Sequence, residues 1–304
     1  MGTFIRSQFK FPPMNWWFVA LNDIAVPAES KFSSKSLGEW FSPVEAAGVE
    51  GLTVVVDPNS KVGNGETFKR LQDLRDFPVL KFLDIPTDAI EYVDIERIAP
   101  RLEYLRLSPA RTVSGHEVGL AKNLQFFDVT FPRLKSLYSS FPTICYRNID
   151  VTRFPKLQWL ETDLELDKSA RSLKLFRDVS TILGFGLNGV TKKDILKELN
   201  RTLTALEFAD IRTRALDLSP LSEFTELQYM SIASSRIALD ARPLAKVSRL
   251  IELELVWLKR IDHIEALLDS RSLRRVSIRR VGEGGPDDAM CRQFAARFKS
   301  FEFM

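Results

Sequence analysis

Large apolar residues recur along the chain in a phrase of six residues that returns about every two dozen positions. The first, fourth and sixth residues of the phrase are apolar, as in Leu102, Leu105 and Leu107. Such phrases begin at residues 80, 102, 124, 134, 157, 180, 203, 227, 250 and 273. The starting points lie 22 to 24 residues apart, except that 10 residues separate the phrases at 124 and 134. A fixed period of this length predicts one structural unit that is repeated and stacked.

Each phrase predicts a short strand, and the residues between phrases predict a segment that returns the chain to the next strand. A looser unit over residues 51–56 precedes the first phrase. The return segments repeat as well, because Leu216 and Asp217 recur 23 residues later as Leu239 and Asp240. A single unit cannot bury its own apolar face. We therefore expect stacked units that form a parallel sheet over one continuous leucine core.

Over residues 49–282 this pattern resembles the leucine-rich-repeat family. The resemblance implies an α/β fold: a curved solenoid with a parallel β-sheet on its concave face, mixed helices and loops on its convex face, and a cap at each end. The asparagine that this family carries at the ninth position of the phrase is missing, and Ile211 and Leu258 are among the residues in its place. We therefore expect the turns to be satisfied differently, and a distortion near residues 124–150, where two phrases crowd together.

The two ends of the chain differ from the repeats, as capping requires. Residues 1–48, which include the apolar patch 16–21, predict an N-terminal cap. Residues 283–304 predict a C-terminal capping helix, because apolar residues follow a helical spacing at Met290, Phe294, Phe298 and Phe301. With the repeats over 49–282, these ends predict one continuous domain. Residues 66–75 and 191–200 also have the pattern of helices.

A glycine motif interrupts the repeat at Gly184, Gly186 and Gly189, which spell G-x-G-x-x-G between a strand-like and a helix-like run. This context is typical of dinucleotide-binding sites, but a repeating coil is itself strand, turn and helix, and its even period disfavours such a site. Leu183 and Phe185 are expected in the core, which places Gly184 and Gly186 on the concave face. There the glycines either form a notch that a partner can approach or permit close packing.

Composition disfavours several other functions. The 304 residues are 45% hydrophobic and carry a net charge of +3, which gives no general reason to expect nucleic-acid or membrane partners. Cys145, Cys291, His116 and His263 lack the spacing of a metal site, a disulfide framework or a catalytic triad, so we predict no cofactor and no metal. No apolar run approaches the roughly 20 residues of a membrane helix, and no secretion signal is evident. We expect a cytoplasmic protein.

The third, fifth and seventh positions of each phrase are expected to face away from the core, because side chains alternate along a strand. Aromatic and acidic residues gather there. With the two glycines they form the predicted partner-binding set: Phe82, Asp84, Tyr104, Phe126, Asp128, Tyr138, Trp159, Glu161, Asp163, Gly184, Gly186, Glu207, Tyr229, Glu252 and Glu254. Seven acids against Arg106, Arg275 and Arg279 give this face a charge of −4.

Exposed aromatic anchors with steering carboxylates favour the binding of a basic protein, and the acidic balance disfavours nucleic acid on this face. The alternative is that the rings pack on one another between strands and the acids serve solubility. We predict a non-enzymatic protein-binding module, for example an inhibitor or an immunity protein that blocks a toxin. An adaptor or scaffold is the alternative. An enzyme that uses Glu252 and Glu254 as acid and base is the least favoured hypothesis.

Overall fold

The computed structural model describes residues 16–21, 33–36, 41–56, 69–108, 128–139, 150–163, 171–234 and 237–304. The chain forms two compact units, residues 1–158 and residues 159–304. In both units, parallel strands that follow one another along the chain lie side by side.

Unit 1 contains a parallel sheet in the order β6-β5-β4-β3-β1-β2. Its strands are β1 (Trp16–Leu21), β2 (Ser33–Ser36), β3 (Gly51–Val56), β4 (Phe82–Pro86), β5 (Tyr104–Ser108) and β6 (Ser136–Ser139). Short helical segments connect them: α2 (Pro43–Ala46), η1 (Lys69–Asp76), η2 (Thr87–Tyr92), α4 (Ile95–Ile98) and η4 (Val151–Arg153). The apolar patch at the N-terminus is therefore itself a strand of the sheet, paired with β3.

Unit 2 contains a parallel sheet in the order β15-β14-β12-β10-β9-β8-β7. Its strands are β7 (Trp159–Asp163), β8 (Gly184–Asn188), β9 (Ala205–Ala209), β10 (Tyr229–Ala233), β12 (Glu252–Val256), β14 (Arg275–Arg279) and β15 (Ser300–Phe303). The return segments hold α5 (Arg171–Phe176), η5 (Ile195–Glu198), η6 (Ser219–Glu223), α6 (Arg242–Ala245), η7 (Ile264–Asp269) and α7 (Asp288–Arg297). They also hold a separate two-stranded sheet of β11 (Ala238–Asp240) and β13 (Arg260–Asp262).

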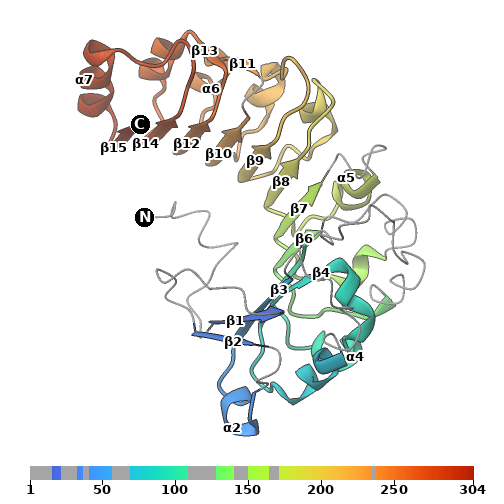
Figure 1. Cartoon of the computed structure of the whole chain (residues 1–304). Coiled ribbons are helices and arrows are strands. Elements are labelled where there is room, and N and C mark those ends of the chain that lie inside the picture. The colour runs from blue at the N-terminus through green and yellow to red at the C-terminus, as the bar shows by residue number, and fades with distance from the viewer. Residues whose placement is uncertain are drawn as a thin grey trace. The chain divides into compact units, whose positions relative to one another are not determined.

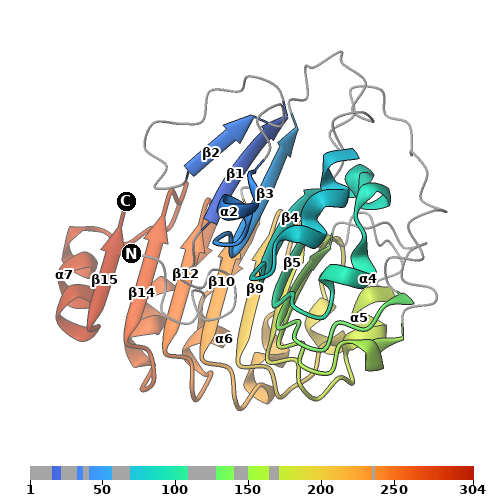
Figure 2. The ribbon, with the colours of Figure 1, turned by 90° about the horizontal axis from the view of Figure 1, so that it is seen from below.

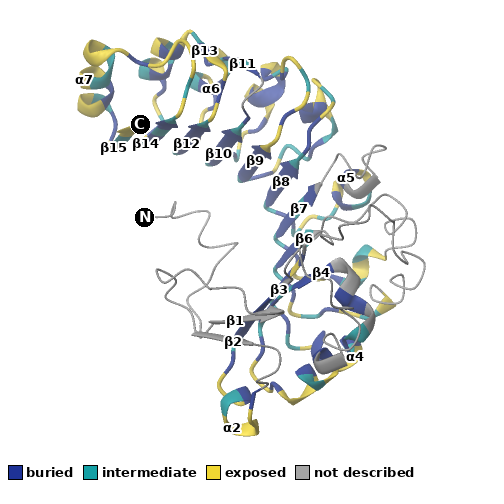
Figure 3. Cartoon of the chain, viewed as in Figure 1, coloured by how far each residue is buried: buried dark blue, intermediate teal, exposed yellow. Residues whose placement is uncertain are grey.

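The strands and the return segments of unit 2 form two layers with the apolar core between them (Figure 1). In Figure 2, β15, β14, β12, β10 and β9 lie side by side in that order. Each coil supplies the leucines of its phrase to the core, and in β10 both Met230 and Ile232 are fully buried. Figure 3 shows the strands of this unit in the colour of buried residues, while exposed positions gather on the return segments and α7.

Tight turns ahead of the strands replace the missing asparagine of the repeat. In Phe77-Pro78-Val79-Leu80 the amide of Leu80 donates to the carbonyl of Phe77 at 3.3 Å. The same bond closes the turns that begin at Phe131 and Phe154, at 3.3 and 3.1 Å, and each of these turns has proline at its second position. Proline suits that position because its ring fixes the backbone angle that the turn requires. The phenylalanine of each turn is buried, so it also fills the core.

The crowded phrases at 124 and 134 resolve in favour of the second. Strand β6 pairs directly with β5, Tyr104 opposite Ser136, which leaves no place in the sheet for a strand between them. Residues 109–127 lie outside the described residues, and 128–129 do not form a strand. The sequence analysis was therefore wrong to predict two adjacent strands here, because it counted apolar spacing without the pairing of neighbouring coils.

The phrase at 180 is displaced by two residues. Gly184 lies opposite Trp159 on one side and Ala205 on the other, so the phrase of β8 begins at residue 182. Its intervals to the neighbouring phrases at 157 and 203 are 25 and 21 residues, not 23 and 23. A shift of two keeps every side chain on its predicted face. Ile182, not Leu183, therefore takes the first core position, and Ile182 is only 2% exposed.

This register gives a direct test by mutation. We expect Ile182→Ala to lower the free energy of unfolding by about 2–5 kcal/mol, because it empties a filled core position. Leu183→Ala should cost about 1 kcal/mol or less, since Leu183 is half-buried. Urea denaturation of both variants measures the difference. Equal losses, or a larger loss for Leu183→Ala, would contradict the register of β8.

The predicted helices agree in place more than in type. The segments expected to be helical over 66–75 and 191–200 contain the 3₁₀ helices η1 and η5. The predicted C-terminal helix is confirmed as α7, which buries Phe294 and begins after the Asp287 side chain accepts a bond from the amide of Met290 at 2.7 Å. Strand β15 after it was not predicted. The domain boundaries at residues 48 and 282 stay predictions.

Candidate binding face

The strands of both units present one side to the core and an open face away from it. We use "open face" for the positions that the sequence analysis placed on the concave side. In unit 2 the strand register aligns these positions in rows across the sheet. The first row contains Trp159, Gly184, Ala205, Tyr229, Glu252, Arg275 and Ser300. The second row contains Glu161, Gly186, Glu207, Ser231, Glu254, Ser277 and Glu302.

The predicted alternation holds, but the open face is far less exposed than expected. Trp159 is 1% exposed and Tyr229 0%. In unit 1, Phe82 and Tyr104 are 3% and 6% exposed. The interpretation of these aromatic residues as a solvent-exposed strip is therefore wrong. Each large ring is covered by its neighbours in the row, which the sequence pattern of a single strand cannot show.

Trp159 and Gly184 explain each other. A methyl group on Gly184 would lie 2.4 Å from Trp159 Cε3 and 2.6 Å from Cζ3, so the indole ring occupies the space above the glycine. Glu161 covers Gly186 in the same way, with its Cγ 2.8 Å from where a Cβ would be. Of the two alternatives that the sequence left open for these glycines, close packing is the one that the geometry supports. The expected notch is filled.

A phenol bridges two buried carboxylates at the centre of the second row. The Tyr229 hydroxyl lies 3.3 Å from Glu207 Oε1 and 3.1 Å from Glu254 Oε2. Because a phenol has one proton, it can donate to only one of the two carboxylates at a time. Glu207 and Glu254 are 8% and 6% exposed, so the expectation that they are freely solvated is also wrong.

Two arginines of β14 offset the acids of β12. Arg275 Nη1 donates to Glu252 Oε2 at 3.3 Å, and Arg279 Nη2 lies 3.9 Å from Glu254 Oε1. Burial raises the pKa of Glu252, the charge of Glu254 raises it further, and Arg275 opposes both. As predicted, Glu252 and Glu254 share one face of their strand. Both are buried and paired with arginine, which makes them part of the packing of this face.

The open face of unit 1 contains a second group of paired charges. Asp84 Oδ2 lies 3.9 Å from Arg106 Nε, and the Arg106 guanidinium carbon lies 4.8 Å from the centre of the Tyr138 ring. These residues are direct neighbours in the register of β4, β5 and β6. Asp84 and Tyr138 are half-buried, whereas the Arg106 side chain is 44% exposed. Arg106 is therefore the accessible charge of this group.

Three members of the predicted set do not join the open face in the described structure. Phe126 and the side chain of Asp163 lie outside the described residues. Asp128 was placed on a strand that does not form. Its carboxylate lies instead 3.6 Å from Arg153 in the return segment η4. Glu302, on the unpredicted strand β15, is the residue of the second row that the sequence analysis missed, because β15 lacks the complete apolar phrase.

The third glycine of the motif has a role in the coil as well. Gly189 follows β8 directly and has a positive φ of 66°. Asp210, Trp257 and Arg280 follow β9, β12 and β14 in the same way and take φ values of 46°, 54° and 55°. The chain thus leaves these strands through a left-handed residue, whether or not that residue is glycine. All three glycines of the motif are explained by coil packing.

Two further searches of the described part of the chain bear on function. Among the described residues, no group of three or more His, Cys, Asp or Glu side chains could hold a metal ion. In the same part of the chain, no helix has both the length and the apolar character needed to cross a membrane.

The stacked coils of strand, turn and return segment define a leucine-rich-repeat fold. No protein-family model matches the chain, and no curated protein matches it. Among solved structures, the chain is similar to the internalin InlF of Listeria monocytogenes, with 14% identity over 87% of this chain and 84% of that chain and a TM-score of 0.42. Internalin C2 of the same organism has 15% identity over 88% of both chains and a TM-score of 0.27. Both TM-scores are below 0.5, so the fold assignment rests on the coils themselves. Folds of this kind offer extended sheet faces, which supports a protein-binding module in general.

Proposed function

We propose that the chain is a non-enzymatic protein-binding module whose open face binds a partner of basic character. The observation that carries this proposal is the composition of the second row in unit 2. Glutamate stands on every other strand, at Glu161, Glu207, Glu254 and Glu302, and the positions between them hold glycine or serine. Parallel strands lie about 4.8 Å apart, so the carboxylates repeat about every 10 Å along the row.

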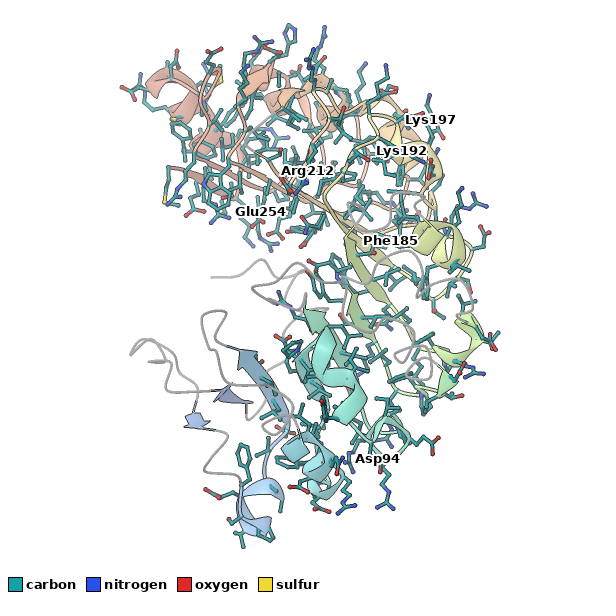
Figure 4. The ribbon with its side chains drawn as sticks, turned by 45° about the vertical axis from the view of Figure 1, so that its right-hand side comes forward. Asp94, Phe185, Lys192, Lys197, Arg212 and Glu254 are labelled. Atoms are coloured by element: carbon teal, nitrogen blue, oxygen red, sulfur yellow. The ribbon has the colours of Figure 1, made fainter. Side chains whose placement is uncertain are left out.

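Distribution of charge supports the same partner. The described strands β7 to β14 carry four glutamates and two arginines on the open face, whereas the return side of the unit includes several lysines. Figure 4 shows Glu254 on the sheet side and Lys192 and Lys197 on the side of the return segments. A basic partner would be steered to the sheet side by this asymmetry and would avoid the return side.

Accessible carboxylates at the two ends of the row would make the first contact. Glu302 is exposed, and Glu161 is half-buried, while Glu207 and Glu254 are buried beneath Tyr229. In this proposal the buried residues Trp159, Tyr229, Glu252 and Glu254 hold the face in shape. Glu161, Glu302 and, in unit 1, Arg106 and Tyr138 are the groups that meet the partner.

The test compares two variants with the same change of charge. Glu161→Lys with Glu302→Lys reverses the ends of the acidic row, and Glu223→Lys with Glu265→Lys makes the same change on the return segments η6 and η7. Affinity capture at about 50 mM salt should recover a basic protein with the wild-type chain, and recovery should fall as salt screens the contact. We expect the row variant to lose at least about tenfold of this recovery, and the control variant to stay within about twofold.

Equal recovery with both variants, or recovery of no basic protein, would contradict the proposal. The captured protein then separates an inhibitor from an adaptor. If it is an enzyme or a toxin, the wild-type chain should abolish its activity and the row variant should not. A partner whose activity is unchanged would favour the adaptor or scaffold alternative over an immunity protein.

A further inference from the structure

A cavity in unit 1, away from the open face, is lined mainly by residues from the turns that precede the strands. It has a volume of about 390 Å³, which is within the range of small-molecule sites. Its charged lining residues are Glu50, Lys81, Arg101 and Arg133. Pro78 and Val79 form an apolar part of its wall, and both are exposed.

Lysine contributes no net charge to this cavity, because each lysine nearby has its own carboxylate. Lys81 Nζ lies 2.6 Å from Glu50 Oε1, and Lys135 Nζ lies 2.6 Å from Glu103 Oε2 in the next pair of coils. The hydrogen bond to Glu50 is the largest cause of a raised pKa of Lys81, so this lysine stays charged and engaged. The two arginines therefore decide the charge of the cavity.

Arg101 is held at the wall by the end of η1. Its Nη2 donates to the carbonyl oxygens of Leu74 and Arg75 at 2.8 and 3.1 Å. Its Nε is buried and has no hydrogen-bond partner among the described residues. Burial lowers the pKa of Arg101, and Asp76 opposes this shift. A buried donor without an acceptor is unfavourable, and a bound anion would relieve that cost.

Arg133 stands one coil further on, at the same position of the repeat, directly before the first leucine of its phrase. It is exposed, and no ion pair or hydrogen bond of its side chain is found among the described residues. Two guanidinium groups without carboxylate partners thus face one cavity that also has an apolar wall. Guanidinium groups are suited to oxyanions because their N–H donors match two oxygens at once.

We propose that this cavity is a binding site for a phosphate monoester attached to an apolar group, with Arg101 and Arg133 on the phosphate and Pro78 and Val79 beside the apolar part. The site does not depend on the proposed function of the open face. It lies at the edge where β3, β4, β5 and β6 begin, so a ligand there leaves the outward side chains of those strands free.

Phenyl phosphate and inorganic phosphate are the probes, and ³¹P NMR titration of the full chain measures their binding. We expect saturable binding of phenyl phosphate at one site, at least about threefold tighter than inorganic phosphate because of the apolar wall. Arg133→Gln should weaken phenyl phosphate binding at least about fivefold, since it removes one charged donor. Lys156→Gln is the matched control, because Lys156 occupies the same repeat position in the following coil and does not line the cavity. It should change binding less than about twofold.

Arg133 is exposed, so its replacement should leave folding unchanged, and the melting temperature of the variant checks this. Absence of saturable binding would overturn the proposal. Equal weakening by Arg133→Gln and Lys156→Gln would also overturn it, because that result would indicate general attraction to a basic surface. Equal affinity for inorganic phosphate and phenyl phosphate would exclude the apolar wall from the site and reject the ligand class that we propose.

Discussion

Trp159→Ala is expected to lower the free energy of unfolding of unit 2 by about 3–5 kcal/mol. This is the cost of emptying a core position. Trp159 lies on the face of the sheet turned away from the leucine core, but it is only 1% exposed and its indole ring covers Gly184. The sequence analysis predicted an accessible anchor there, whose removal would leave stability nearly unchanged.

Trp257→Ala is the matched control. Trp257 is 51% exposed and makes its described ring contact with Arg280, whose guanidinium carbon lies 5.5 Å from the ring centre. We expect this change to cost about 1 kcal/mol or less. Guanidinium denaturation of both variants gives the comparison, with the transition of unit 2 followed separately if the two units unfold apart. A cost below about 1 kcal/mol for Trp159→Ala would show that the ring is not packed as described.

Gly184→Ala is expected to cost about 1–3 kcal/mol, because the added methyl group would meet the Trp159 ring at 2.4 Å. A strand otherwise favours alanine over glycine by roughly 0.5–1 kcal/mol, so the two effects oppose each other. We expect the clash to dominate, since the listed neighbours of the new methyl are ring atoms and the Ala205 methyl, not the end of a long flexible chain.

Gly285→Ala is the control for this second change. Its added methyl group would lie 3.3 Å from Phe303 Cζ, at the edge of a ring that is 42% exposed and able to move. The same denaturation experiment should find a change of about 0.5 kcal/mol or less. If Gly184→Ala were as harmless as Gly285→Ala, the space above Gly184 would have to be open.

The repeat itself could be predicted from the sequence because its signal is repeated in every coil. Strands β4, β5, β6, β7, β9, β10, β12 and β14 all lie where the apolar phrases place them. One coil is an exception in register: the phrase of β8 begins at Ile182, and Leu183 misled the count because it is a leucine at an expected interval. Only pairing with both neighbours decides between two such positions.

Exposure of the open face could not be predicted in the same way. Alternation along one strand correctly assigns Trp159, Glu207 and Tyr229 to that face, but burial depends on the residues beside them on other strands. Trp159 is buried because its neighbour is glycine, and Glu207 because Tyr229 lies next to it. A row across the sheet joins residues 21 to 25 positions apart, and the exact register is needed to write it down.

This difference changes how binding must be tested. Substitution of Trp159 or Tyr229 would disturb the sheet, and a loss of binding would then report a loss of structure. The informative positions are those that the row leaves accessible, such as Glu161 and Glu302. Charge reversal there, with a matched reversal on the return segments, separates recognition from folding.

The central claim is that neighbouring coils stack in the register of β7 and β8, so that the open face is closed by its own side chains. A double-mutant cycle with Trp159→Ala and Gly184→Ala tests it most directly. Once the ring is removed, Gly184→Ala should become neutral or stabilising, with a coupling energy of at least about 1 kcal/mol between the two sites. Strict additivity, with the same cost of Gly184→Ala in both backgrounds, would contradict the account.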